Sequence, residues 1–251
     1  TQTTDGRHHF AVCEVTRMTK VYQASDIGKV RENNEDSLAI FPPEIYMVAD
    51  GMGGRAGGEV ASGLAVKTIQ AQTAKRPLHE AELRQAVMAA NETILAMARS
   101  HQEYDGMGTT VTLLHLEAAM AYWAHVGDSR LYLFRAGALQ QITRDHSLVA
   151  DLVAKGSITR EEARFHPQRN MITRAVGTEQ DLSVDTGVFP LCDGDTLILC
   201  SDGLTSAVTD EEIRQVLTEN RRDDKAAALV ERALALDSQD NISVVVVCYG
   251  A

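Results

Sequence analysis

The sequence lacks several features that mark particular classes of protein. No CxxC pair is present, and no His/Cys spacing suits a zinc site. No apolar run approaches the roughly 18 residues of a transmembrane helix, and no basic segment followed by an apolar one suggests a secretory signal. The 4 cysteines lie far apart or in apolar surroundings, at Cys13, Cys192, Cys200 and Cys248. We therefore expect buried free thiols in a soluble, cytoplasmic protein.

Basic residues are scarce relative to acidic ones. The chain has 24 Lys plus Arg against 35 Asp plus Glu, which gives a formal net charge of −11. No Lys/Arg-rich stretch offers the basic footprint that a phosphate backbone needs, so we expect neither nucleic acid nor membrane as a partner. Part of the excess acidity is expected to come from carboxylates gathered around divalent cations.

Repeats, low-complexity segments and Pro/Ser-rich linkers are absent as well. The 251 residues, 44% of them hydrophobic, are enough for one large core, so we predict a single domain over 1–251. It has a polar extension over 1–9 and a polar surface excursion over 145–178, where only short helical patterns occur.

Hydrophobic periodicity predicts strands that are mostly joined by hairpins and helices that come in adjacent pairs. Segment 22–37 is polar and turn-rich, and segment 109–134 is interpreted as an antiparallel meander. The order favours an α+β fold with antiparallel sheets layered against helix pairs over an alternating doubly wound fold. Strands are predicted at 10–16, 38–41, 45–49, 109–116, 119–126, 131–134, 139–142, 182–188, 195–200 and 242–247, and helices at 57–77, 83–97, 148–155, 160–165, 210–217 and 225–236.

Five aspartates share one local setting, a turn directly beside a predicted strand and often next to glycine. They are Asp36, Asp50, Asp128, Asp202 and Asp240. Any one of them could be an ordinary turn or capping residue. If the sheets converge, however, all five side chains meet at one rim, where two carboxylates ~5 Å apart repel by about 3 kcal/mol at an effective dielectric near 20. A positive group has to lie between them.

Oxygen ligands without clustered His or Cys favour Mg²⁺, Mn²⁺ or Ca²⁺ over zinc or copper. Two such ions ~3.5–4 Å apart, bridged by a carboxylate and a water, form a device suited to attack on phosphorus. The pattern of aspartates therefore predicts a site for paired divalent cations.

Seven motifs occur in a distinctive order. They are RENNED from Arg31, VADGMGGRAGGEVAS around Asp50, GMGTT from Gly106, VGDSRLYLFR around Asp128, ITRAVGT from Ile172, CSDGLT around Asp202 and DNISVVVV from Asp240. This series resembles the motifs of the metal-dependent serine/threonine protein phosphatases of the protein phosphatase 2C (PPM) type, and above all of their compact bacterial members, and the likeness covers about residue 11 to residue 249. The resemblance implies an α-β-β-α sandwich, in which two packed antiparallel sheets are flanked by antiparallel helix pairs, with a binuclear Mn²⁺/Mg²⁺ centre at one end.

The resemblance also implies a set of metal ligands. By position, Asp50 bridges both ions, and the Gly51 carbonyl with waters completes the shell of one of them. Asp202 and Asp240 hold the other ion. Asp128, together with Asp202, matches the site of a third and weaker ion in bacterial relatives.

Three more residues match positions that act on the phosphoryl group or on the water. Arg31 fits the phosphate-binding arginine, because a guanidinium fork suits two phosphoryl oxygens. The alternative is a surface arginine in a charged turn. Asp36 matches an acidic residue that holds a water ligand, and Glu35 is expected to orient such a water or Arg31. The implied reaction is direct in-line hydrolysis of phosphoserine or phosphothreonine, and no CxxxxxR loop supports a cysteine mechanism.

One departure from the family pattern bears on proton transfer. Many eukaryotic relatives have histidine after the Asp-Gly pair and use it as general acid, whereas this chain has Met52. A thioether cannot donate a proton, so a water ligand or another group must protonate the leaving oxygen. His146 is one candidate, although a hinge role is the preferred interpretation, and His115 and His125 are expected to be strand residues without chemistry.

Segment 145–178 corresponds to the flap of the family, and we expect it to influence substrate choice and third-ion affinity. The preferred interpretation is a monomeric phosphatase that acts on phosphorylated Ser/Thr proteins and counteracts a bacterial kinase. One alternative is a catalytically idle binding or scaffold domain, but idle members lose metal aspartates and all of them are present here. Another keeps the catalysis and takes an anti-sigma antagonist as substrate.

Overall fold

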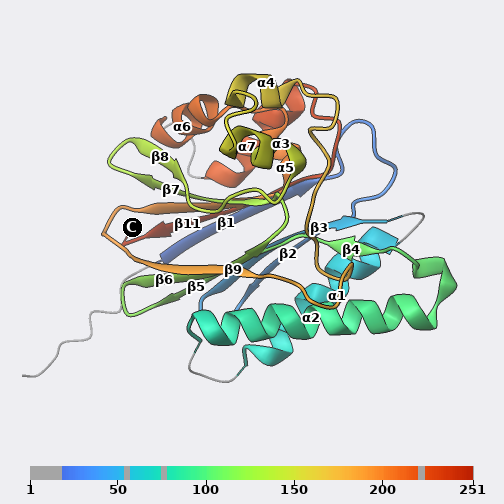
Figure 1. Cartoon of the computed structure of the whole chain (residues 1–251). Helices are drawn as coiled ribbons and strands as arrows, with labels where there is room; N and C mark the ends of the chain where they lie inside the picture. Colours follow the sequence, from blue (N-terminus) through green and yellow to red (C-terminus); the bar gives the residue numbers. More distant parts are fainter. Residues whose placement is uncertain (1–18, 54–56, 75–77, 220–223, 251) are drawn as a thin grey trace, which may run out of the picture.

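Two antiparallel β-sheets pack face to face, and helices cover the outer face of each (Figure 1). This computed structural model describes residues 19–53, 57–74, 78–219 and 224–250. One sheet has the strand order β1-β11-β10-β7-β8, with β1 Thr19–Asp26, β7 Arg130–Arg135, β8 Ala138–Gln141, β10 Thr196–Cys200 and β11 Ile242–Tyr249. The other has the order β2-β3-β5-β6-β9 with β4 paired to β3, and comprises β2 Asp36–Phe41, β3 Ile45–Met52, β4 Gly108–Thr109, β5 Val111–Glu117, β6 Met120–Val126 and β9 Asp185–Pro190.

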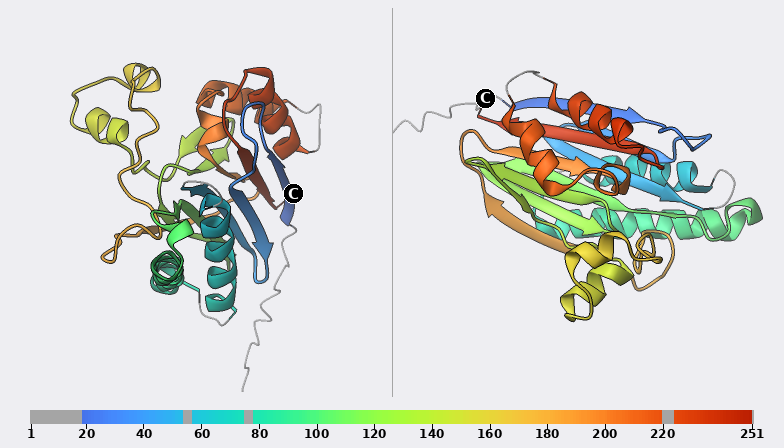
Figure 2. Two further views of the ribbon diagram at one scale, coloured as in Figure 1. Left: turned by 90° about the vertical axis from the view of Figure 1, so that its right-hand side faces the viewer. Right: turned by 90° about the horizontal axis from the view of Figure 1, so that it is seen from above.

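The helices form an outer layer on each side of the sandwich. The sheet of β3 is covered by α1 (Gly57–Gln72) and α2 (Glu80–Ser100), and η1 (Gln102–Tyr104) follows α2. The sheet of β11 is covered by α5 (Asp202–Thr205), α6 (Asp210–Thr218) and α7 (Lys225–Ala235). The predicted α-β-β-α sandwich is thus confirmed. The short helices α3 (Leu148–Ala154) and α4 (Arg160–Arg164) lie in the predicted flap and stand out from one side of the sandwich (Figure 2).

The period of two along each strand divides the hydrophobic residues between separate cores. In β3, Met47 and Ala49 pack in the core beneath α1 and α2, whereas Tyr46 and Val48 pack in the core between the sheets. Strand β11 is a β-branched run buried on both faces because it is central in its sheet, and its residues alternate between the helix side and the layer between the sheets.

The same alternation directs the side chains of two of the predicted aspartates into the layer between the sheets. Asp50 has the parity of Tyr46 and Val48, and Asp36 has the parity of Leu38, which also packs between the sheets. Asp36 and Asp50 are cross-strand partners in the β2–β3 ladder. Both side chains therefore belong to the layer between the sheets, at the end where β2 begins and β3 finishes.

Two expectations about strands were wrong. The polar segment 22–37 is turn and loop only over 27–35, because its first residues belong to β1 (Thr19–Asp26), a half-buried edge strand that is hydrogen-bonded to β11. The run 109–134 is not a simple meander either. Strand β6 pairs with β5 and β9 while β7 pairs with β10, so the chain crosses from one sheet to the other at Gly127–Ser129. The strand predicted at 10–16 lies outside the described residues.

The cysteines only partly follow expectation. Cys200 is buried and Cys248 is half-buried, both as free thiols, but Cys192 is exposed because it lies in the turn before β10. Cys13 falls outside the described residues. Among the residues that the structure describes, no helix is long and apolar enough to cross a membrane.

Candidate metal centre

The carboxylates converge at one end of the layer between the sheets. Asp36 accepts a hydrogen bond from Ser201 Oγ at 2.8 Å, although the two residues are 165 positions apart. Asp202 directly follows Ser201, and its carboxylate accepts a hydrogen bond from the Asp50 carboxyl. The ends of β2, β3 and β10 thus bring three of the five predicted aspartates into one group.

Burial and mutual repulsion raise the pKa of these acids. Burial is the main cause for Asp50, whose pKa lies well above the usual range, and repulsion by Asp36, Asp202, Asp128 and Asp240 adds to it. Burial raises the pKa of Asp36 to about 7 and that of Asp202 to about 6. Packing several carboxylates this closely is costly unless cations compensate them.

Arg31 and Asp240 form an ion pair at the mouth of this group, with 2.7 Å between Arg31 Nη2 and Asp240 Oδ2. The next residue, Asn241, secures the loop that carries Arg31: its Oδ1 accepts the Glu35 N–H at 2.9 Å, and its Nδ2 donates to the Asn33 and Ile27 carbonyls. The loop before β2 is thereby held against the start of β11.

Gly51 is required by close packing next to the predicted bridging residue. A Cβ atom at this position would lie 2.2 Å from the Gly58 carbonyl oxygen and 2.5 Å from that of Glu35. The Gly51 N–H also donates to the Glu35 carbonyl at 3.1 Å. Only glycine lets β3 approach both the start of α1 and the loop of Glu35. The pKa of the Glu35 carboxyl is raised, mainly by burial.

Asp128 lies on the wall of a pocket of about 630 Å³ between the flap and helices α5 and α6. Asp202 lies on the same wall, so the pocket opens directly beside the carboxylate group. The pKa of Asp128 is raised well above its usual range, first by burial and then by repulsion from Asp202 and Asp145. The fifth aspartate is therefore within electrostatic range of the others, at the side that faces the flap.

Comparisons with known proteins agree with this arrangement. The family model described as Protein phosphatase 2C matches residues 29–235. The chain belongs to the protein phosphatase 2C family. It is 39% identical over 234 residues to the serine/threonine phosphatase stp of Listeria monocytogenes, with 89% of this chain and 93% of that protein covered.

Solved structures of protein phosphatase 2C relatives share the fold. The serine/threonine phosphatase PstP/Ppp of Mycobacterium tuberculosis is similar with a TM-score of 0.85 and 39% identity, covering 92% of this chain and 98% of that one. The catalytic domain of PstP in complex with 2 manganese ions is similar with a TM-score of 0.84 and 37% identity, again covering 92% and 98%.

The acids of this protein phosphatase 2C domain fit divalent cations by their chemistry. The donor set is made of oxygens, and Asp36 Oδ1 is buried without a hydrogen-bond partner among the described residues. Within the described part of the chain, no three His, Cys, Asp or Glu side chains are arranged to hold an ion as they stand. Asp240 is instead hydrogen-bonded to Arg31, and Asp202 to Asp50.

Several polar residues that support the site were not predicted. Besides Asn241 and Ser201, Thr110 accepts the Asp50 N–H at 2.9 Å through its hydroxyl, and Thr109 donates its hydroxyl to the Asp50 carbonyl. These residues occur within the motifs GMGTT, CSDGLT and DNISVVVV, next to the predicted carboxylates. Their position within these motifs was the one indication that they support the site. They were missed because the sequence was searched for charged metal ligands, and these side chains are neutral.

The three histidines considered from the sequence are all buried. His115 lies in β5 and His125 in β6, and burial lowers the pKa of His125 to about 4. His146 is 7% exposed, and both ring nitrogens are engaged, Nδ1 by the Gly127 N–H and Nε2 by Asp185. These contacts support the hinge interpretation of His146 over a role as proton donor.

Proposed function

We propose that this chain is a protein serine/threonine phosphatase that hydrolyses phosphoserine and phosphothreonine with the help of two Mn²⁺ or Mg²⁺ ions. The observation that carries the proposal is the convergence of acids from the ends of β2, β3 and β10 and from the crossing turn, with pKa values raised by burial and mutual repulsion. The names of its relatives, serine/threonine phosphatases, support the same activity.

When bound, the two metal ions would neutralise phosphoryl charge and lower the pKa of a water that attacks phosphorus. Asp50, the Gly51 carbonyl, Asp202 and Asp240 are the proposed ligands of the two ions, and Asp128 with Asp202 those of a third. Asp36 and Glu35 would accept hydrogen bonds from water and hold it for in-line attack.

Arg31 would bind two phosphoryl oxygens and stabilise the charge on them in the transition state. Its guanidinium is half-exposed, with 52% of the side chain accessible, and it reaches the carboxylate group from the solvent side. Binding of an ion by Asp240 would release Arg31 for the substrate. The salt bridge between Arg31 and Asp240, a proposed metal ligand, supports this role of the arginine.

The pocket beside Asp128 and Asp202 is suited to the peptide that carries the phosphoryl group. Its volume of about 630 Å³ is typical of ligand sites. The flap contributes Arg160, Arg164 and Arg169 to its lining. These arginines lie opposite acids that line the same pocket, among them Asp128 and Asp202, so the flap supplies positive side chains near the proposed metal site, which supports the expected influence of segment 145–178 on substrate choice.

Hydrolysis of a phosphothreonine peptide should depend completely on divalent cations. With Mn²⁺ or Mg²⁺ we expect steady release of inorganic phosphate, and after removal of the ions with a chelator we expect none above background. Readdition of Mn²⁺ should restore the rate, which excludes irreversible unfolding as the cause. Hydrolysis that survives thorough chelation would contradict the mechanism, and absence of hydrolysis with either ion would favour the idle scaffold.

Arg31→Ala should lower kcat/KM for the phosphopeptide by about 10²-fold, because a charge-assisted bidentate contact to the phosphoryl group is lost. Lys29→Ala is the matched control. Lys29 is on the same loop and forms an exposed ion pair with Asp237, so its removal should change kcat/KM less than about 2-fold. Equal effects of the two variants would show that Arg31 is only a surface residue of a charged turn.

The proposal extends to a cytoplasmic monomer that reverses the action of a serine/threonine kinase. The substrate class supports the kinase, since phosphorylated Ser and Thr side chains are its products. The presence of all five aspartates argues against the idle alternative.

A further inference from the structure

The turn that carries Asp128 is the crossing point between the two sheets. Gly127 has a positive φ of 112°, and a Cβ atom there would lie 2.5 Å from Thr110 Cγ2. On the Ser129 side the turn is held by two threonines: Thr110 Oγ1 lies 2.7 Å from Ser129 Oγ, and Thr112 Oγ1 donates to the Ser129 carbonyl at 3.2 Å. These bonds fix only one half of the turn.

The other half is held by His146 through both its main chain and its ring. The His146 N–H donates to the Gly127 carbonyl at 2.7 Å, and the Gly127 N–H donates to His146 Nδ1 at 3.0 Å. The imidazole is buried and lies against His125, with 4.9 Å between the ring centroids. Both polar groups of the residue before Asp128 are thus bonded to a single residue at the start of the flap.

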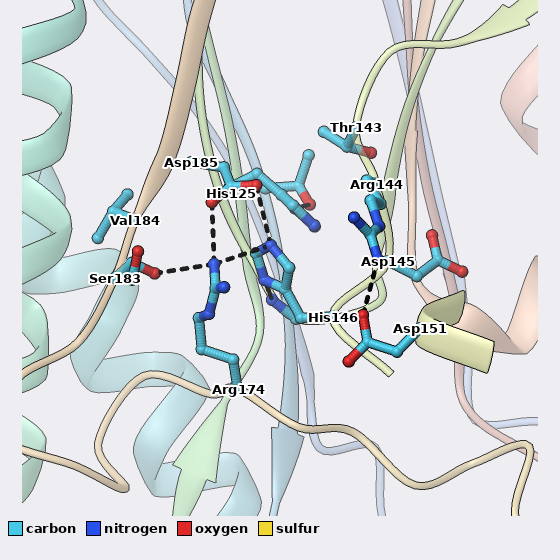
Figure 3. A network of polar contacts seen from close by, with 12 residues as sticks. His125, Thr143, Arg144, Asp145, His146, Asp151, Arg174, Ser183, Val184 and Asp185 are labelled. Carbon is cyan, nitrogen blue, oxygen red and sulfur yellow. Dashed lines mark hydrogen bonds and ion pairs between the residues drawn. The ribbon is translucent and has the colours of Figure 1, made fainter. Parts of the chain in front are cut away.

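The far side of the His146 ring is bound to the segment that returns from the flap (Figure 3). Because Nδ1 accepts the Gly127 N–H, the neutral ring carries its proton on Nε2, which donates to Asp185 Oδ2 at 3.1 Å. Arg174 Nη1 donates to Asp185 Oδ1 at 2.9 Å and to the Ser183 carbonyl at 3.2 Å, and it also lies 3.0 Å from His146 Nε2. The Gly127 N–H at Nδ1 thus fixes the tautomer of His146, while the Asp185 carboxylate lies between two donors, His146 Nε2 and Arg174 Nη1, and holds the ring against the arginine.

Main-chain contacts also join the start of the flap to the segment that returns from it. The Thr173 N–H donates to the His146 carbonyl at 2.8 Å, and Ser147 and Ile172 form an isolated antiparallel bridge. The two ends of the flap are thereby joined at the residue that holds Gly127. A movement of the flap base would be transmitted to the turn before Asp128 by direct hydrogen bonds.

We propose that His146 is a positioning residue, which fixes the Gly127–Ser129 turn so that the Asp128 carboxylate faces Asp202 and can bind the third ion, and that Asp185 and Arg174 orient it. The inference rests on the proposed function. It assigns no proton transfer to His146. Residues that orient a ligand from behind typically change metal affinity by about 10–100-fold when they are replaced.

The test is Mn²⁺ binding by the full chain, measured by isothermal titration calorimetry with tight and weak ions resolved. His146→Phe keeps the ring volume but removes both nitrogens, and we expect at least about 10-fold weaker binding of the third ion with the two tight ions unchanged. Asp128→Ala is the reference, since it should lose the third ion and keep the two tight ones. His146→Asn, which can place an acceptor near the position of Nδ1, should recover most of the affinity.

His115→Phe is the matched control, because His115 is a buried imidazole at the other end of the β5–β6 ladder. It should leave the third ion within about 2-fold of the wild type. An equal loss in His115→Phe, or no loss in His146→Phe, would overturn the proposal. If His146→Phe fails to fold, the affinity for the third ion is measured in Asp185→Asn instead, since Asp185 is partly exposed and its carboxylate orients the ring. A weaker third ion in this variant supports the proposal, and an unchanged one overturns it.

Hydrogen exchange separates this inference from the proposed function. In the ion-free wild type the Gly127 amide should be protected by His146, and in His146→Phe it should exchange at least about 10-fold faster, while His146→Asn restores protection. Unchanged exchange would overturn the positioning role even in an active enzyme. A wild type that binds no Mn²⁺ would instead overturn the proposed function, and one that binds only two ions would refute the third-ion assignment.

Discussion

Asp202→Ala is expected to lower kcat for a phosphothreonine peptide by at least about 10³-fold, because this carboxylate is a proposed ligand of one of the two tightly bound metal ions and of the third ion. A loss of this size corresponds to about 4 kcal/mol of transition-state stabilisation, within what ions contribute in such sites. The ion-free variant should melt no lower than the wild type, since burial and repulsion by Asp240 raise the pKa of Asp202 to about 6 and make its charge unfavourable at neutral pH. The measurements are phosphate release in excess Mn²⁺ and melting in chelator.

Asp195→Ala is the control, because Asp195 and Asp202 flank opposite ends of strand β10. Asp195 is 1% exposed and precedes β10, where it accepts hydrogen bonds from Arg135 at 2.7 and 2.6 Å. Its removal should lower the melting temperature and leave kcat within about 3-fold. Asp202→Ala activity within 10-fold of the wild type would show that Asp202 is not a ligand.

The ion-free protein should become less stable as the pH rises from about 4 to about 7. The unfolded aspartate has a pKa near 3.9, whereas burial raises the folded pKa of Asp36 to about 7 and that of Asp202 to about 6. Between these values the folded state binds more protons than the unfolded state, so the free energy of unfolding falls with rising pH. The total change should be on the order of a few kcal/mol, measured by denaturant unfolding in chelator across this range.

Saturating Mn²⁺ should reverse that dependence, because the ions bind the deprotonated carboxylates of the folded state and stabilise it increasingly as the pH rises. Asp50→Asn should flatten the ion-free curve by removing one repelling acid. An ion-free stability that rises through this range would mean that the carboxylates are already compensated by other groups. That result would contradict the electrostatic account of the site.

Secondary structure followed closely from local patterns where an element buries a wide apolar face. The strand at Ile45 and the run of valines in β11 extend only a few residues beyond their predicted limits. Strand β1 was missed because it is a half-buried edge strand whose polar residues have the composition of a loop. The four-residue helix α5 is too short to give a periodic pattern.

The site was predictable as a set of residues but not as a set of contacts. Arg31 and Asp240 were both expected there, yet their ion pair joins positions 209 residues apart and has no local indication in the sequence. A hinge role was likewise preferred for His146 over that of a proton donor, but its hydrogen bonds to Gly127 and Asp185 have no local indication in the sequence.

The sequence by itself determined antiparallel strands, paired helices and the acids at the strand ends, because alternating burial and Asp-Gly turns are encoded by neighbours along the chain, while the sandwich of two sheets was implied by the resemblance of its motifs to the protein phosphatase 2C family. Only the tertiary structure decided that the chain changes sheets at Gly127, that Arg31 pairs with Asp240 and that His146 links this crossing to Asp185. Those contacts depend on how separate segments pack against one another, and the distance between two segments in space is not set by their separation in sequence.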